Sequence, residues 1–224
     1  MAKQDYFTKP KPQGYFGNVR KEVVAEVPLG SGAVLEIGCG EGGTGATLKA
    51  EGRAAWVSGV ELFAEAAAEA AKKLDEVIVG DIEKIELPFV ENQFDVLVLG
   101  DVLEHLVDPW GQLDRLCKYL APQGIIIASL PNVRNWRVIL PLVLSGKWEY
   151  QNSGIMDRTH LRFFTRRGIV DLFQRCGLVI TKISPTSGGK SKMLLRLPLG
   201  FMEGFIAPQY LIIARRSLGK AQNE

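Results

Sequence analysis

Short apolar runs alternate with helix-forming segments along the first half of the chain. Five runs have the length and composition of buried strands: 34–37, 56–60, 77–80, 94–99 and 124–130. Helical composition or spacing predicts the helices among them: about 43–51, 62–74 and 109–120. Strands and helices that alternate in this way form a parallel sheet with right-handed crossovers and helices on both faces. We therefore expect an α/β fold.

The first apolar run carries a carboxylate and leads into a glycine-rich turn. It reads Val34-Leu-Glu-Ile-Gly-Cys-Gly-Glu-Gly-Gly-Thr44, with Glu36 two residues before the first glycine. The glycines satisfy G-x-G-x-x-G, a pattern that by itself also describes a dinucleotide site. The Glu36 carboxylate would repel a pyrophosphate but attract a ligand that carries an ammonium and a sulfonium. S-adenosylmethionine (SAM) is such a ligand, so the turn favours SAM over a nicotinamide dinucleotide.

Three more predicted strands finish beside acidic residues. Glu61 and Asp81 follow the second and third apolar runs directly, and Asp101 follows the fourth after Gly100. In open parallel sheets, ligands bind outside the carboxyl ends of the strands. Together with Glu36, these acidic residues are therefore expected to face a single crevice.

These residues resemble the class I SAM-dependent methyltransferases over roughly Val34 to Phe164. The similarity is greatest to bacterial ubiquinone-type and glycan-associated O-methyltransferases. It implies a Rossmann-like, doubly wound sheet of seven strands, mostly parallel, with one antiparallel strand and helices on both faces. After the first half we expect a helix at about 166–176 and strands at 178–184 and 210–214, the last two strands forming a hairpin-like pair.

The resemblance also implies which residues bind SAM. They lie at the strand ends and in the turns that follow: Glu36, Gly38, Cys39, Gly40, Glu61, Leu62, Asp81, Ile82, Gly100 and Asp101. In that family the glycine turn lies against the methionine part of SAM, and the residue matching Glu36 helps hold that end. The residue matching Glu61 holds the ribose hydroxyls, and the one matching Asp81 approaches the adenine amine.

Both histidines of the chain follow predicted strands. His105 closes Asp101-Val-Leu-Glu-His105, just past the fourth strand, and His160 lies in the long excursion after the fifth. In a doubly wound sheet both can reach the same crevice. On a helical turn, Asp101, Glu104 and His105 would share one face, because they are spaced i, i+3, i+4.

Two mechanisms are compatible with these residues. In the first, Asp101, His105 and His160 act on the acceptor, and a histidine is the general base for in-line methyl transfer to oxygen or nitrogen. In the second, Glu104 and the two histidines, with Asp101, hold a divalent metal that lowers the acceptor's pKa. The pattern resembles the acidic-x-x-Glu-His of ubiquinone-type O-methyltransferases and small-RNA 2′-O-methyltransferases, although Asp101 stands where those have glutamate.

Three functions remain open at this stage. The stretch 104–165 is most similar to bacterial methyltransferases of glycan and sugar modification, which implies O-methylation of a small hydroxyl acceptor such as a sugar or glycan. The alternative is a SAM-binding partner protein that does no methylation, because 131–136 resembles an accessory family of methionine biosynthesis. A nicotinamide-dependent oxidoreductase is the third, and Glu36 inside the strand argues against it.

Composition and chain organisation predict the domain division and the cellular location. We expect an N-terminal cap at 1–30, with a helix at 18–27, and a SAM-binding domain at 31–224. The excursion 131–165 is too long for an ordinary connection and is interpreted as a substrate lid. Three widely spaced cysteines and the lack of an apolar signal core predict a cytoplasmic protein.

The surface charge excludes one class of partner and leaves two contacts open. A net charge of +2 gives no general nucleic-acid footprint. The basic and apolar segment 184–220 could touch a membrane or a lipid-linked acceptor. Packing at the sheet edge or in a homodimer interface is the more ordinary role for such a segment.

Overall fold

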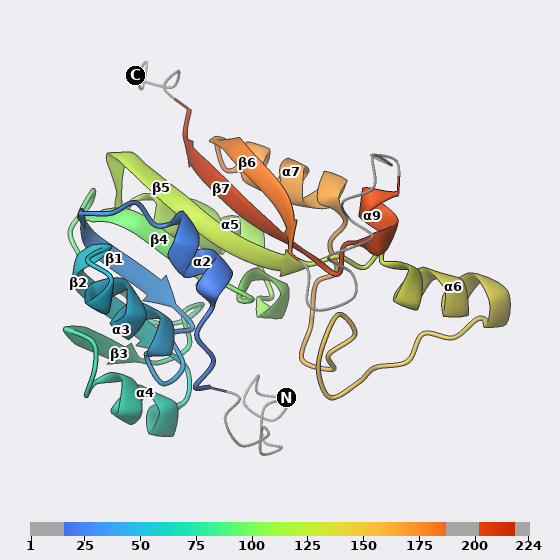
Figure 1. Cartoon of the computed structure of the whole chain (residues 1–224), viewed down its shortest axis with the longest axis horizontal. Coiled ribbons are helices and arrows are strands. Elements are labelled where there is room, and N and C mark those ends of the chain that lie inside the picture. Colours follow the sequence, from blue (N-terminus) through green and yellow to red (C-terminus); the bar gives the residue numbers. More distant parts are fainter. Residues whose placement is uncertain (1–15, 187–201, 218–224) are drawn as a thin grey trace.

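The computed structural model describes residues 16–186 and 202–217, and these residues form one seven-stranded sheet (Figure 1). The strand order is β3-β2-β1-β4-β5-β7-β6. Neighbouring strands are parallel except where β7 pairs antiparallel with both β5 and β6. The expected mostly parallel sheet with one antiparallel strand is therefore confirmed.

The strands agree closely with the apolar runs of the sequence. Their bounds are β1 (Ser31–Ile37), β2 (Ala54–Glu61), β3 (Glu76–Val79), β4 (Phe94–Gly100), β5 (Leu120–Pro131), β6 (Leu178–Thr186) and β7 (Gln209–Arg216). The described helices are α2 (Lys21–Glu26), α3 (Gly43–Ala50), α4 (Ala64–Ala70), the 3-10 turn η1 (Leu103–His105), α5 (Pro109–Cys117), α6 (Trp136–Ser145), α7 (Arg166–Arg175) and α9 (Glu203–Ile206).

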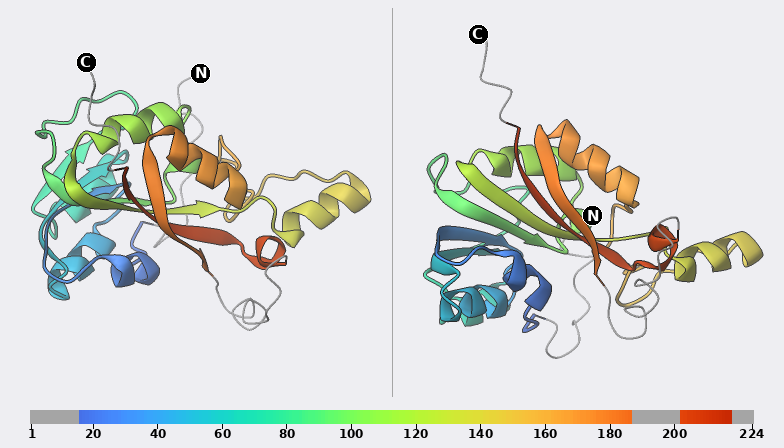
Figure 2. Two further views of the ribbon diagram at one scale, coloured as in Figure 1. Left: turned by 90° about the horizontal axis from the view of Figure 1, so that it is seen from above. Right: turned by 45° about the horizontal axis from the view of Figure 1, so that its top comes forward.

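Alternating side chains of the central strands supply two buried clusters, one on each face of the sheet. Leu35 of β1 and Leu97 of β4 belong to the cluster that includes side chains of α5 and α7. Val34 and Val96, one position earlier on each strand, belong to the cluster that includes α2 and α3. Because successive strand residues point to opposite faces, a strand buried on both sides is apolar at every position. Figure 2 shows helices on both sides of the sheet.

The excursion 131–165 is not a uniform lid, because it contains a ten-residue helix that the sequence interpretation missed. The Asn135 side chain accepts a hydrogen bond from the Arg137 N–H and begins α6, and Gly146, with φ 66°, ends it. The run 138–144 is apolar at every position and includes Pro141, so it shows no helical alternation of apolar and polar residues. Figures 1 and 2 both show α6 projecting away from the sheet.

The structure differs from the sequence predictions in the N-terminal helix and in the segment 184–220. α2 is shorter than the predicted 18–27, and residues 1–15 of the predicted cap lie outside the described residues. Of the segment 184–220, residues 202–217 form α9 and β7, and β7 lies inside the sheet between β5 and β6. The three cysteines are unpaired, and no helix among the described residues is long and apolar enough to cross a bilayer.

The start of α5 provides a test of the local folding argument. The Asp108 side chain accepts a hydrogen bond from the Gly111 N–H at 3.0 Å, and Pro109 occupies the first helical position. Replacing Asp108 by Ala removes this cap and should lower the free energy of unfolding by about 1 kcal/mol, as measured by urea denaturation. Asp114→Ala, on the exposed side of the same helix, removes an equal charge and should change stability much less. Equal losses in the two variants would contradict the capping role.

Candidate active site

A cavity of about 1060 Å³ lies at the carboxyl ends of β1, β2 and β4. It is larger than the roughly 300–1,000 Å³ that small-molecule sites usually occupy, so it has room for a cofactor and an acceptor together. Every sequence-predicted site residue lines it: Glu36, Gly38, Cys39, Gly40, Glu61, Leu62, Asp81, Ile82, Gly100, Asp101, Glu104, His105 and His160. The fold thus brings these residues together, while their roles toward a ligand stay predictions.

The glycine turn after β1 lies tightly between strand β2 and the N-terminal cap. Gly38 and Gly40 have φ values of 70° and 55°, in the left-handed region that favours glycine. A Cβ on Gly40 would lie 2.5 Å from the backbone oxygen of Phe16. Phe16 also packs its ring against Phe63, with ring centroids 5.1 Å apart. The turn therefore needs glycine both for its conformation and for the close approach of the cap.

Glu61 at the end of β2 is held by the turn that faces it. Its Oε2 accepts the Gly40 N–H at 2.8 Å, and its Oε1 accepts the Phe63 N–H at 3.0 Å. Burial raises the pKa of Glu61, and these backbone donors oppose the rise. Each carboxylate oxygen keeps a second lone pair, so the fixed carboxylate can still accept hydroxyl groups from a ligand.

Glu36 is buried with an oxygen that has no hydrogen-bond partner among the described residues. The residue is only 4% exposed, and the unpartnered atom is Oε2. Burial raises the pKa of Glu36 to about 8, and the positive charge of Arg20 opposes this rise. An unpartnered buried acceptor beside a cavity suits a cationic donor from a ligand, such as the ammonium of SAM. The acidic hydrogen-bond acceptors at this end of the cavity therefore fit SAM.

Cys39, the middle residue of the glycine turn, is a small packing residue. It is buried, and burial raises the pKa of its thiol, with the nearby Glu36 and Glu61 adding to the rise. The thiol is therefore protonated at neutral pH, which is unfavourable for a nucleophile. Cys39 therefore has no observed feature of a nucleophile, and its contact with SAM stays a prediction.

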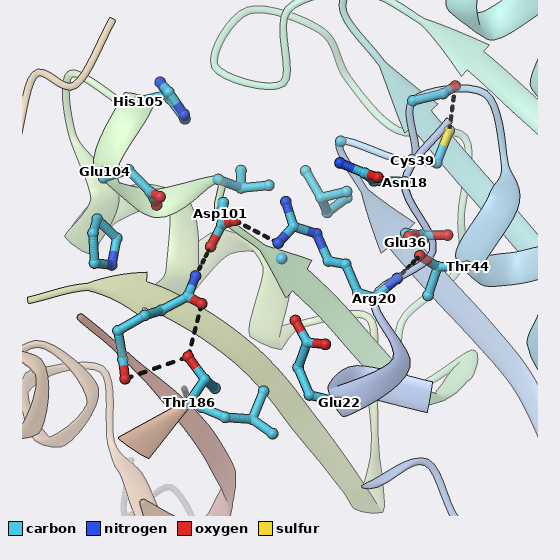
Figure 3. A pocket seen from close by; sticks show the side chains of 18 of the residues that line it. Asn18, Arg20, Glu22, Glu36, Cys39, Thr44, Asp101, Glu104, His105 and Thr186 are labelled. Atoms are coloured by element: carbon cyan, nitrogen blue, oxygen red, sulfur yellow. Dashed lines mark hydrogen bonds and ion pairs between the residues drawn. The ribbon is translucent and has the colours of Figure 1, made fainter. Parts of the chain in front are cut away.

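Arg20 is a site residue that the sequence analysis missed. Figure 3 shows its side chain extended across the cavity, between the Glu36 end and Asp101. The Arg20 guanidinium donates to Asp101 Oδ2, and the backbone N–H of Arg20 donates to the Thr44 hydroxyl at 3.2 Å. A Cβ on Gly100 would lie 2.6 Å from Arg20 Cδ, so glycine leaves the space for this arginine. Nothing in the local sequence signals a pairing across 81 positions.

Asp101 is fixed from three directions in an unusual backbone conformation. It has φ 54°, and its Oδ1 accepts hydrogen bonds from the Ser129 hydroxyl at 2.7 Å and from the Gln209 amide. Ser129 is on β5 and Gln209 begins β7, so the insertion of β7 beside β5 helps to build the site. Asp101 is therefore part of a rigid polar group with Arg20, next to the predicted position of the methyl donor.

The two histidine rings lie side by side, and their hydrogen bonds determine which ring nitrogen carries the proton. His105 Nδ1 lies 3.0 Å from the Thr159 carbonyl, and His160 Nδ1 lies 3.0 Å from the Ile155 carbonyl. Since a carbonyl only accepts, each neutral ring carries its proton on Nδ1 and a lone pair on Nε2. The ring centroids are 4.8 Å apart. The sequence prediction that both histidines reach one crevice is consistent with this geometry.

Glu104 completes a compact group with the histidines. It is 1% exposed, its Oε2 has no hydrogen-bond partner among the described residues, and burial and the nearby Asp101 raise its pKa. One candidate ligand atom from each of Glu104, His105 and His160 lies within 4.8 Å of the others. Two imidazoles and a carboxylate are a donor set that divalent metals accept. Asp101 instead belongs to the neighbouring group around Arg20.

Comparison with known proteins identifies the family. Residues 15–183 match the family model described as a methyltransferase domain. A ubiquinone biosynthesis O-methyltransferase of Psychrobacter cryohalolentis is 31% identical over 144 residues, which span 61% of this chain and 54% of that protein. A demethylmenaquinone methyltransferase of Staphylococcus aureus is 24% identical over 79% of this chain and 80% of its own length.

Solved structures agree with this result at the level of the fold. A SAM-dependent methyltransferase of Thermotoga maritima superimposes with a TM-score of 0.63, at 22% identity, covering 88% of this chain and 86% of that one. The chain therefore belongs to the methyltransferase-domain family, as a SAM-dependent methyltransferase with the class I fold. The expected cofactor, SAM, is confirmed, and the non-enzymatic partner protein is not favoured. The sugar or glycan acceptor, the homodimer and the cytoplasmic location stay predictions.

The raised pKa of Glu36 should make the free energy of unfolding depend on pH. Between its ordinary pKa of 4.5 and its raised value of about 8, the folded chain binds a proton that the unfolded chain has lost, so this residue makes stability fall as pH rises. At pH 8, Glu36→Gln should raise the free energy of unfolding, by on the order of 1–3 kcal/mol, and weaken the pH dependence across this window. Denaturation at pH 5 and pH 8 measures both changes.

The same variant should bind SAM at least about tenfold more weakly, because a neutral amide attracts the ammonium less than a carboxylate does. Glu65→Gln, an exposed residue of α4, is the matched control for both measurements. If Glu36→Gln kept the stability profile and the SAM affinity of the unchanged protein, the assigned role of Glu36 would be wrong.

Proposed function

We propose that this chain transfers the methyl group of SAM to a hydroxyl oxygen of a small acceptor. The observation that carries the proposal is the pair of imidazoles, His105 and His160. Both line the cavity that also holds Asp101 and the strand-end carboxylates, and both have Nδ1 held by a backbone carbonyl. A lone pair on Nε2 suits the removal of a hydroxyl proton near neutral pH.

The cofactor would be held along the carboxyl ends of the first strands. Glu36 attracts the ammonium of the methionine part, and Arg20 offers a guanidinium to its carboxylate. Glu61 accepts the ribose hydroxyls, and Asp81 with the backbone of Ile82 faces the adenine. When bound, SAM supplies an electrophilic methyl on its sulfonium. Opposite charges at the two sides of the methionine group would orient it in one direction.

In the transfer step, the acceptor oxygen bonds to the methyl carbon as the bond from sulfur to that carbon breaks. The hydroxyl proton passes to His105 Nε2, since Nδ1 already donates to the Thr159 carbonyl. His160, in ring contact with His105, limits the orientations of that ring and of the acceptor. Alignment of the three reacting atoms supplies much of the remaining acceleration.

A metal-assisted version of the same reaction is the second candidate. It is favoured by Glu104, whose buried Oε2 has no partner among the described residues and which lies with both histidines in a potential ligand group. Imidazoles whose Nδ1–H donates to a carbonyl are typical of metal-binding histidines. A divalent ion there would lower the pKa of an acceptor hydroxyl. The two histidines would then be ligands and not bases.

Two kinds of hydroxyl compound are the candidate acceptors. The sequence resemblance favours sugars or glycans, whereas the relatives from Psychrobacter and Staphylococcus are named for ubiquinone and menaquinone compounds. Both kinds would require proton removal during methyl transfer. An acceptor screen should therefore contain sugar hydroxyls and the phenolic hydroxyls of quinols, with amines as the comparison for N-methylation.

His105 provides the direct test with whichever acceptor the screen finds. His105→Ala should lower turnover by about 100-fold or more, because it removes the proton acceptor, and should leave the affinity for S-adenosylhomocysteine unchanged. Added imidazole should restore part of the activity if His105 is a base. Full activity in His105→Ala would exclude a catalytic role for this residue.

The same assay after removal of metals separates the two mechanisms. With His105 as base, dialysis against a chelator leaves turnover unchanged, and Glu104→Gln lowers it only modestly. Loss of activity on chelation, with recovery on adding magnesium, manganese or zinc, would contradict the base mechanism and establish the metal-assisted one.

A further inference from the structure

Helix α6 exposes an apolar surface far from the sheet. Among the side chains of this helix, only Val138 is buried. Every residue from 142 to 150 is exposed, and Val143 and Leu144 are 72% and 78% exposed. Figures 1 and 2 show the helix extending beyond the rest of the molecule in each view. A helix with so few polar side chains normally has a second apolar surface against it.

The apolar surface of α6 consists of exposed apolar side chains of the helix, together with Trp148 just after it. Its members are Trp136, Leu140, Leu142, Val143, Leu144 and Trp148. Four of them recur at i, i+4, i+7 and i+8, so they form a continuous stripe along the helix. Trp136 begins the helix, and the Trp148 ring packs against Phe163, with ring centroids 5.2 Å apart. Exposed clusters of this kind mark contacts with proteins or lipids, and tryptophan is enriched where lipid tails meet water.

The charges around this surface are mainly positive. Residues 133–149 contain three basic residues, Arg134, Arg137 and Lys147, and one acidic residue, Glu149. The Arg137 guanidinium lies over the Trp136 ring, 5.5 Å from its centroid, at the edge of the apolar stripe. Such cations can stay beside headgroups while the stripe enters the acyl region. Anionic lipid headgroups would match this charge.

We propose that α6 docks in the surface of a membrane that contains anionic lipids. Its ten residues span only about 15 Å, half of the roughly 30 Å hydrocarbon core, so the helix would lie in the interface and not cross it. The excursion that carries α6 continues into residues 153–160, and Ser153, Gly154, Ile155, Asp157 and His160 line the cavity. Docking would thus hold the catalytic cavity near the lipid surface.

A second copy of the chain matches this surface less well. In a two-fold symmetric pair, the same patch meets itself, so Arg137 and Lys147 of one copy would approach those of the other. Because 133–149 holds three basic residues and one acidic residue, that arrangement gathers net positive charge around the apolar contact. Anionic headgroups neutralise it instead, so the lipid surface is the occupant that the charge favours.

Vesicle flotation of the full chain tests the docking surface. We expect binding to vesicles of phosphatidylglycerol mixed with phosphatidylcholine, and much weaker binding to phosphatidylcholine alone. The double variant Val143→Ser with Leu144→Ser should lower the partition coefficient by at least about tenfold, because two aliphatic groups no longer enter the acyl region. Leu29→Ser with Val90→Ser is the matched control, since these residues are 72% and 69% exposed elsewhere on the surface.

A second double variant tests how much the basic residues contribute to vesicle binding. Arg137→Gln with Lys147→Gln should weaken binding to the anionic vesicles several-fold and reduce its dependence on salt. Both double variants should bind S-adenosylhomocysteine as the unchanged protein does, because neither touches the cavity. This readout separates a failure of docking from a failure of the methyltransferase site.

Three results would overturn the proposal. The unchanged protein could fail to float with anionic vesicles, or the Val143→Ser with Leu144→Ser variant could float equally well. The third is a dimer in sedimentation, without vesicle binding, that this variant converts to a monomer. That outcome would assign the surface to a second copy of the chain.

Discussion

The burial of charged groups at the carboxyl ends of parallel strands is the constraint on which the site depends. Glu36 lies inside β1, where helices on both faces exclude water, and its Oε2 has no partner among the described residues. Burial favours its protonated form, whereas Arg20 favours the ionised one. A cationic ligand would shift this balance further toward the carboxylate. The site is thus less stable alone than with a ligand of the right charge.

Long-range contacts make this site rigid. Arg20 from the cap, Ser129 from β5 and Gln209 from β7 all converge on Asp101. Arg20 and Gln209 come from opposite ends of the chain and Ser129 from its middle, and the antiparallel insertion of β7 beside β5 is what brings Gln209 there. The fold of the second half therefore supports chemistry whose motifs lie mainly in the first half.

The part of the site that sequence could predict is the part set by periodicity. Glu36 lies inside the first apolar run, and Glu61, Asp81 and Asp101 follow the next three. Parallel strands place these ends along one edge. Arg20 and Gln209 could not be predicted in this way, because they reach Asp101 only through tertiary packing. Helix α6 was missed for a different reason: an exposed helix without polar alternation gives the same pattern as buried chain.

Calorimetric titration with SAM, S-adenosylhomocysteine and NAD is the most direct test of the central claim, that buried carboxylates at the strand ends form a site for a cationic adenosyl cofactor. The account predicts micromolar binding of SAM and S-adenosylhomocysteine and no binding of NAD. It also predicts a clear loss of SAM affinity in Glu61→Ala, which removes the acceptor assigned to the ribose. Binding of NAD alone, or unchanged SAM affinity in Glu61→Ala, would contradict it.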